Sequence, residues 1–458
     1  MARPASRATP LGVPLGVPLG VPLGAPLGVP LAPPHASVIH RWQRGVSVRE
    51  VPLVTPWFLL FAGFFVVGTA IAAFRLFGGS LASFAAMTDV YAWGVWKTFN
   101  VMALTALGSS ALAVGLAAWV LGRHRLHSVM RTALVTSFLF YTTALLGLLT
   151  DVGRPWNFWN LLLPWRWNTE SALWEVALAM PVYCALFLLY ENGPMVVEKL
   201  WNARSDRVRG WVRTWHPRIR KTYPFVVPFA YVLPIIHQSS LGGLMVLAGH
   251  KVHPLWQTDL LPLLYLVQAL ICGFGSVIVV LMTSCLVWRR PLDVKVLGEL
   301  ANLMSWTTLG WLVLRLGDVV VRGRVGDALA MDAFGVLFLA ETAAVAVPAL
   351  VLRSAHLRET PRALYTMALL ACLGGIAYRF IPTTLAYAPG AGSTYFPAVP
   401  EIVITLGLVA TVVGAFSLVV KRFAVLPAPL ESWHHAVEHD SHAHPSHRSD
   451  AHGHAVHD

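Results

Sequence analysis

The sequence predicts an all-α membrane protein, a polytopic bundle of about ten transmembrane helices. Of its 458 residues, 56% are hydrophobic and only 12% are charged, whereas soluble domains carry about a quarter charged residues. The apolar residues form blocks of about 20 or more, long enough for a helix to cross a hydrocarbon core of about 30 Å. Lipid is therefore the expected solvent of this chain.

Ten apolar blocks are expected to be the spans. Their approximate bounds are 55 to 77, 91 to 121, 128 to 150, 171 to 191, 222 to 248, 258 to 288, 296 to 321, 327 to 352, 361 to 386 and 400 to 425. An even number of spans places both termini on the same side of the membrane.

The distribution of Lys and Arg predicts which side this is. The two ends of the chain and the loops on their side hold 25 of the 34 basic residues, whereas the alternate loops hold five. Because cytoplasmic loops are enriched in positive charge, both termini are predicted to be cytoplasmic and the other five loops periplasmic. The net charge of +12 is thus explained by topology rather than by nucleic-acid binding.

Two tails of low complexity flank the expected membrane domain, residues 51–427. Residues 1–50 contain a repeat of the type LGVP, whose regular prolines favour an extended, solvated chain and interrupt the apolar core that a signal peptide needs. Residues 428–458 contain nine His, without a spacing that defines a coordination geometry. A disordered His-rich tail is the preferred interpretation, with metal buffering as the alternative.

Polar and ionisable side chains inside the spans are functional candidates, because burying them in lipid is costly. In the predicted topology most of them lie toward the periplasmic end, while Glu341 lies near the middle of its span and Glu299 near the cytoplasmic end. Arg315 and Asp318 share one helix face, so a structural pairing between them is equally consistent with their spacing. A helix-to-helix hydrogen bond is likewise an alternative role for His237 and Gln238.

This asymmetry meets the requirements of a quinone site. The carbonyl oxygens of a quinone need hydrogen-bond donors, its reduction needs proton donors, and its prenyl tail needs an apolar path to lipid. His237 is expected to bond one carbonyl and the carboxylates to relay protons. The residues expected to line or support the pocket are Asp151, Arg154, Glu175, His237, Gln238 and Trp93. Those expected along a proton path are Glu341, Glu299, Arg315, Asp318 and Arg379.

A b-type haem is the competing cofactor, and it needs two axial ligands at matching depth. His237 is the one histidine deep in a span, since His250 and His253 lie roughly 20 Å further along if the helix continues. The four cysteines, all in apolar blocks, lack metal-ligand spacing. We therefore expect no haem, no iron–sulfur cluster and no metal site in this chain, so electrons must arrive from a partner. The loop AGHKVHPLWQT, from Ala248, is polar enough to dock one.

Several motifs resemble those of the NrfD and polysulfide-reductase membrane-subunit family. The stretch TDVGRPWNFWNLL, from Thr150, is similar to the family's aspartate-glycine-arginine-proline signature. More specifically, the chain resembles the integral membrane subunits of hydrogenase 2, the HybB group. This resemblance runs from about residue 55 to 427. The motifs that carry it are YAWGVW from Tyr91, LPIIHQSSLGGLMVLAGHKVHPLWQT from Leu233, VLRLGD from Val313 and YAPGAGSTYFP from Tyr387.

The resemblance implies a haem-free, quinone-reactive subunit in the bacterial inner membrane. Its partners would be a periplasmic iron–sulfur electron-transfer subunit and the small and large subunits of a nickel–iron hydrogenase. Electrons from hydrogen would pass to menaquinone or ubiquinone near the periplasmic face, with proton uptake. The chain departs from the expected pattern where Asn100 replaces an acidic residue and Lys97 an apolar one, which puts proton delivery through that span in doubt.

Three alternatives remain at this point. The partner could be another periplasmic oxidoreductase, because a fold does not determine it. A secondary transporter would explain intramembrane charges, and Pro224, Pro228 and Pro234 would suit a broken helix, although transporter sites lie near the midplane. A passive anchor without bound quinone is the third.

Overall fold

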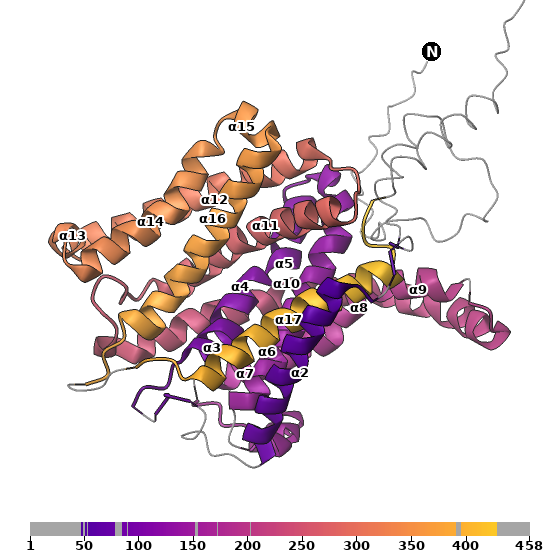
Figure 1. The fold of residues 1–458 in the computed structure, drawn as a ribbon, viewed down its shortest axis with the longest axis horizontal. Helices are drawn as coiled ribbons and strands as arrows, with labels where there is room; N and C mark the ends of the chain where they lie inside the picture. The colour runs from indigo at the N-terminus through magenta and orange to yellow at the C-terminus, as the bar shows by residue number, and fades with distance from the viewer. Residues whose placement is uncertain are drawn as a thin grey trace, which may run out of the picture.

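The structure is a computed structural model that describes residues 47–48, 51–52, 54–77, 85–88, 90–151, 154–171, 173–201, 203–390 and 395–427. Within these ranges the regular secondary structure is helical, as the sequence predicts, apart from isolated bridges such as that between Val252 and Tyr387 (Figure 1). The tail predicted at 428–458, and that at 1–50 except for 47–48, lie outside the described residues.

Among the described residues, eight helical segments are long and apolar enough to cross a membrane. They are Pro56–Phe77 (α2), Val95–Val120, His124–Asp151, Pro224–Lys251, Leu261–Val287 (α11), Ala333–Val351 (α14), Pro361–Leu385 and Val399–Arg422 (α17).

The other two expected spans are helical but do not meet this criterion. One consists of Leu173–Val182 (α7), Tyr183–Leu188 (η7) and Leu189–Glu191 (α8), followed by Gly193–Trp201 (α9). The other is Val294–Val321 (α12), which carries Lys295, Glu299, Arg315 and Asp318. Short helices connect the long ones at their ends, namely His124–Val129 (η4), Pro155–Leu162 (η5), Pro164–Arg166 (η6), Gly249–Lys251 (η8), Val325–Leu329 (α13) and Ala355–Glu359 (α15).

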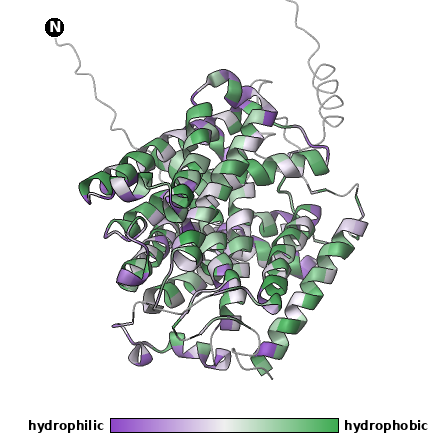
Figure 2. Ribbon diagram, turned by 60° about the vertical axis from the view of Figure 1, so that its left-hand side comes forward, coloured by the Kyte–Doolittle hydropathy of each residue, from purple (hydrophilic) through white to green (hydrophobic). Residues whose placement is uncertain are grey.

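Helix α11 lies at the centre of the bundle. It packs against Asp206–Ala248 (α10), α12, Pro361–Phe380 (α16) and Ser110–Gly115 (α5). Helix α2 lies at the edge, where it packs on α17 (Figure 1). Large apolar side chains on it, such as Trp57 and Phe64, are exposed, and Figure 2 shows hydrophobic residues along most of the helices of the bundle. Exposed apolar side chains along a long helix are expected where lipid, not water, surrounds the protein.

The α2–α17 contact depends on two glycines. A Cβ atom added to Gly68 would lie 2.8 Å from the Cα of Gly407, and one added to Gly407 would lie 2.9 Å from the Cα of Gly68. Both distances are too short for a side chain, so the two backbones approach as closely as small residues allow. Small residues play this role where helices pack in membranes.

Helix α10 is continuous over 43 residues although it contains Pro217, Pro224, Pro228 and Pro234. Each proline removes one backbone hydrogen bond, but a neighbouring helix can compensate for that loss in a membrane protein. The broken helix that would have favoured a transporter is therefore absent from this segment.

Irregularity takes another form, the π-helical turn. Such turns span Thr98–Leu104 (η2), Leu116–Val120 (η3), Tyr183–Leu188 (η7) and Ile381–Leu385 (η9). Together with Val95–Lys97 (α3) and Thr105–Leu107 (α4), η2 forms the first half of the span Val95–Val120. Because π-helical turns widen a helix and concentrate at functional sites, the part of the bundle that contains η2 and η9 is a candidate functional site.

The two ends of the bundle differ in their connections. At the end where α6 (Met130–Asp151) finishes, the loops after α10 and α16 pair, with His253 N donating to Ala386 O at 2.9 Å and Ala388 N donating to Lys251 O at 2.7 Å. At the opposite end, Val48 N donates to Val420 O at 2.9 Å. The charge distribution predicts that the first end is periplasmic and the second cytoplasmic.

Candidate functional site

Some of the predicted site residues lie together at the end of the bundle that is predicted to be periplasmic. Asp151 is the last residue of α6, and its Oδ1 accepts a hydrogen bond from Nε1 of the fully buried Trp96. Lys97 and Arg75 are the cationic neighbours of this carboxyl group. The Lys97 ammonium lies 5.5 Å from the ring centre of Trp93, which is partly buried. Three helices therefore meet at Asp151.

Asn100 lies in the π-helical turn beside this group and is completely buried. Its side chain lies against Gly147, one turn before Asp151, because a Cβ on that glycine would be 2.5 Å from Asn100 Nδ2. Asn100 lies within reach of the Asp151 carboxyl group, but Asn100 Nδ2 and Oδ1, and Asp151 Oδ2, form no well-directed hydrogen bond to any described residue. A buried polar atom without a partner costs about 1–3 kcal/mol, so the site is suited to a polar ligand or water.

A carboxylate that the sequence argument did not single out supports the same region. Glu401, in the first turn of α17, is completely buried and accepts hydrogen bonds from Ala86 N at 2.7 Å and from the hydroxyl of Tyr395. The Tyr395 oxygen in turn accepts from Val95 N at 2.7 Å. Glu401 therefore holds the beginning of the span that carries Trp96. The only signal in the sequence is an acidic residue near a helix start, which is usually structural.

Tyr91, just before that span, stacks on Tyr395 with ring centres 5.1 Å apart and donates to the carbonyl of Thr384. Burial, assisted by the neighbouring Tyr387, raises the pKa of Tyr91 to about 12, so the hydroxyl remains a donor. Thr98 Oγ1 also donates to Thr383 Oγ1 at 3.2 Å. A side-chain hydrogen bond thus joins the π-helical turns η2 and η9, and Tyr91 bonds η9 from the segment before η2.

His237 and Gln238 form a second, deeper polar layer. Gln238 Nε2 donates to the Tyr141 hydroxyl at 3.0 Å, and the Tyr141 ring meets His237 edge-on at 5.6 Å. Both ring nitrogens of His237, which is 1% exposed, have no hydrogen-bond partner among the described residues. Tyr141 precedes Asp151 by ten residues on α6, or about 15 Å of helix. The structure therefore does not place His237 and Asp151 in one pocket.

Arg379 lies between the two layers and is completely buried. It donates to Gln268 Oε1 at 2.7 Å, to the carbonyl of Tyr265 at 2.8 Å and to that of Met102, within the π-helical turn η2, at 3.3 Å. Within the described ranges no carboxylate lies within 4.0 Å of it. The bundle therefore contains a guanidinium stabilised by neutral acceptors alone. Its positive charge is not compensated by a carboxylate, so electron-rich groups are favoured at this depth.

Arg315 and Glu341 form a buried ion pair between α12 and α14. Both are 3% exposed, and Arg315 Nη2 lies 3.1 Å from Glu341 Oε2, which also accepts from Trp256 Nε1 at 2.8 Å. Arg315 therefore pairs across helices, as the structural alternative supposes, but its partner is Glu341 and not Asp318. Asp318 instead contacts Arg322 at 2.7 Å and Thr258 at 2.8 Å, because the facing helix offers Arg315 a better-placed carboxylate.

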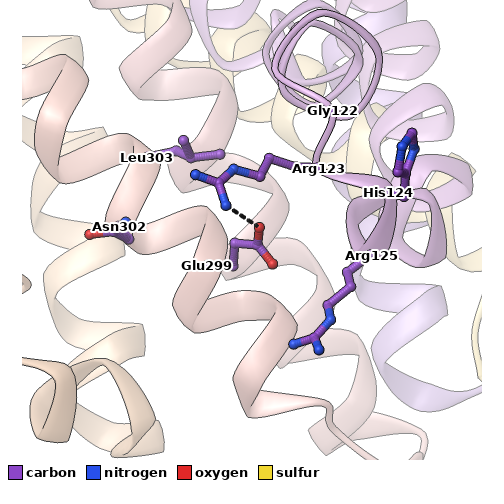
Figure 3. A pocket seen from close by; sticks show the side chains of 7 residues that line it. All are labelled: Gly122, Arg123, His124, Arg125, Glu299, Asn302 and Leu303. Carbon is purple, nitrogen blue, oxygen red and sulfur yellow. Dashed lines mark ion pairs between the residues drawn. The ribbon is translucent and has the colours of Figure 1, made fainter.

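Glu299 lies near the other end of α12, where its carboxylate is 3.7 Å from Arg123 beside a hollow of about 430 Å³ (Figure 3). It precedes Arg315 by 16 residues, or about 24 Å along the helix. The residues expected along a proton path thus occupy separate places, and a path through them stays a prediction. Arg154 is exposed in the loop after α6, and the side chain of Glu175, a residue of α7, lies outside the described part.

Comparison with known proteins identifies relatives over much of the chain. The family model described as "Polysulphide reductase, NrfD" matches residues 84–387. The "Probable Ni/Fe-hydrogenase 2 b-type cytochrome subunit" of Escherichia coli is 33% identical over 380 residues, covering 82% of this chain and 94% of that protein. The "Menaquinone reductase, integral membrane subunit" of Nitratidesulfovibrio vulgaris is 26% identical over 338 residues, covering 69% and 78%. A selenate reductase subunit of Mesobacillus selenatarsenatis is 22% identical, covering 45% and 51%.

Proposed function

The chain belongs to the polysulphide reductase NrfD family, and on this premise we propose that it is the quinone-reactive membrane subunit of a hydrogenase-2-type nickel–iron hydrogenase. It is a multi-pass membrane protein whose relatives are membrane subunits of redox complexes. The Escherichia coli relative supports a hydrogenase as the partner, and the menaquinone reductase relative supports a quinone as the electron acceptor. The selenate reductase relative keeps a second candidate open, the membrane subunit of another oxidoreductase.

The observation that carries the proposal is the set of buried, unpartnered polar atoms on Asn100 and Asp151. An amide nitrogen, an amide oxygen and a carboxyl oxygen can together bond a quinone carbonyl or hydroxyl. Such residue types fit a quinone head group. When bound, a quinone would accept two electrons and two protons.

The residues of the chain have separate tasks in this proposal. Asn100 Nδ2 donates to the bound oxygen and orients it, while Asp151 Oδ2 supplies or receives a proton. Trp96, which donates to Asp151 Oδ1, keeps the other carboxyl oxygen directed at the site. Lys97 and Arg75 balance the charge that the carboxylate carries between proton transfers. His237 and Gln238 support the deeper layer, with His237 as a further hydrogen-bond partner.

Electrons would come from outside the chain. We propose that a periplasmic iron–sulfur subunit docks over the end where α6 finishes and connects it to the hydrogenase small and large subunits. Haem is not required by this proposal, and the donor set does not suit a bis-histidine haem. His237 is buried within the apolar span of α10. The other described histidines lie at helix ends, in loops, or in the first turns of α10, which precede its apolar span.

The decisive experiment separates hydrogen oxidation from quinone reduction in the purified complex. The variants are Asp151→Asn and, as a matched control, Asp327→Asn, since Asp327 is 46% exposed and pairs with Arg324 at 3.2 Å. A positioned acid or base contributes about 10²–10⁴ in rate, so Asp151→Asn should lower hydrogen-to-quinone turnover at least tenfold. Reduction of a soluble dye by the hydrogenase subunits should be unchanged.

Asp327→Asn should behave as the wild type in both assays. If Asp151→Asn assembles with all partner subunits and reduces quinone at the control rate, the assignment of the site is wrong. If neither the wild type nor Asp151→Asn copurifies with a redox partner, the proposal that the chain is a subunit of a redox complex is wrong.

A further inference from the structure

A basic hollow lies at the end of the bundle opposite Asp151. It is formed where the chain turns from η3 into η4 and meets the second turn of α12, and it has a volume of about 430 Å³ (Figure 3). The side chains around it are Arg123, His124, Arg125, Glu299, Asn302 and Leu303. Apart from Glu299, which the sequence analysis places on a possible proton path, the residues in this hollow have no part in the proposed quinone chemistry.

The hollow carries an excess of positive charge. Glu299 is the one acidic residue that lines it, and its carboxylate is 3.7 Å from an Arg123 side chain that is 53% exposed. Arg125 has no acidic partner within 4.0 Å among the described residues. A third guanidinium borders the site, because Arg353 Nη1 donates to Asn302 Oδ1 at 2.8 Å. Three arginines thus line or border a hollow that contains one carboxylate.

Apolar side chains flank this charge. Val120 and Leu121, directly before the hollow, are 72% and 58% exposed. Trp306, one turn after Asn302 on α12, is 58% exposed and lies under the Arg353 guanidinium at 4.1 Å. Trp306 lies midway along α12, but Arg353 lies two residues past the end of α14, and tryptophan beside arginine at the end of a span is typical of the membrane–water interface. The surface therefore combines a cationic hollow with an apolar side that faces lipid.

We propose that this hollow binds the phosphate headgroup of an anionic phospholipid, whose acyl chains lie along Val120, Leu121 and Trp306. The arginines match a phosphate, which they bond through paired N–H groups. A soluble anion would leave the exposed apolar side unused, and a zwitterionic lipid brings no net charge to compensate the arginines. The charge distribution of the chain predicts that this end is cytoplasmic, where anionic lipids attract basic segments.

The experiment uses the full complex, purified in detergent and depleted of lipid. Phosphatidylglycerol, phosphatidylcholine or inorganic phosphate is titrated, and bound lipid is counted by native mass spectrometry while the thermal midpoint is recorded. The test variant is Arg123→Gln with Arg125→Gln. The matched control is Arg207→Gln with Arg213→Gln, two exposed arginines of α10 at the same end.

A basic residue near anionic lipid contributes about a fivefold factor in affinity, so the test variant should bind phosphatidylglycerol about 25-fold more weakly. The control and the wild type should bind it alike and more tightly than phosphatidylcholine. Arg123→Lys with Arg125→Lys should retain most of the binding, which keeps the test valid if the glutamine variant does not assemble. Equal phosphatidylglycerol binding by test variant and wild type would overturn the site. Full stabilisation by inorganic phosphate alone would overturn a lipid as the ligand.

Discussion

The buried pair of Arg315 and Glu341 provides a quantitative test of the structure. Each partner is 3% exposed, and Trp256 Nε1 donates to the same carboxylate at 2.8 Å. Removal of one partner of a buried ion pair costs about 3–5 kcal/mol, because the other charge is left without compensation. Arg315→Met and Glu341→Gln should therefore each lower the free energy of unfolding by about that amount.

The double variant should be much milder than the sum of the two. With both charges removed, no uncompensated ion remains, and the glutamine oxygen can still accept from Trp256. Charge-free replacements of buried ion pairs are often neutral or stabilising, so we expect a total cost of about 0–2 kcal/mol once the lost contacts of Arg315 with the rings of Trp311, Phe338 and Tyr378 are included. The resulting coupling energy would be at least about 4 kcal/mol.

The assay is equilibrium unfolding in mixed micelles, with helicity as the signal, for the wild type, both single variants and the double variant. Such a cycle isolates the interaction between the two side chains. Additive costs, with the double variant as unstable as the two singles summed, would show that Arg315 and Glu341 do not interact, and the packing of α12 on α14 would then be wrong.

Three further predictions follow from other contacts. Gly68→Leu should separate α2 from α17, because no space exists opposite Gly407. The yield of cross-linking between cysteines placed on these two helices should therefore fall. Gly63→Leu should not change this yield, because no atom lies within 4 Å of a Cβ added at Gly63. His237→Phe removes no hydrogen bond seen among the described residues. The free energy of unfolding should therefore be unchanged or rise by about 1–3 kcal/mol, while the rate of quinone reduction falls. A large drop in the free energy of unfolding would contradict this. The purified chain should show no haem absorption band after reduction, and a stoichiometric band would refute the argument from histidine positions.

Composition alone was sufficient to predict the helical architecture, because apolar blocks of span length have few other structures available in lipid. The position of Asp151 at the end of a span follows the same logic, but its hydrogen-bond donor Trp96 was not singled out, because the sequence offers Trp93 and Trp96 without indicating which of them faces α6. The partner of Arg315 could not be predicted, since it depends on how α12 and α14 are rotated about their axes. Glu401 and Ala86 are 315 residues apart in sequence, so no local pattern reveals their contact.

The separation of His237 from Asp151 is a related case. Asp151 lies at the end of its helix as expected, whereas His237, which was expected toward the periplasmic end of its span, lies near the middle of Pro224–Lys251, because depth from hydropathy is uncertain by several residues. An error of that size, at about 1.5 Å per residue, is enough to merge two polar layers into one apparent pocket. The π-helical turns were equally invisible, because their sequences are ordinary apolar stretches.

The π-helical turn at Thr98–Leu104 makes the surroundings of Asp151 sensitive to chain length. A turn of this kind amounts to an α-helix with one inserted residue, and each residue of a helix advances it by about 100° around its axis. Loss of one residue there would turn Trp96 and Lys97 away from Asp151 while every helix stayed in place. A single codon could thus disconnect the carboxylate from its donor in a protein that still folds, inserts and binds its neighbours.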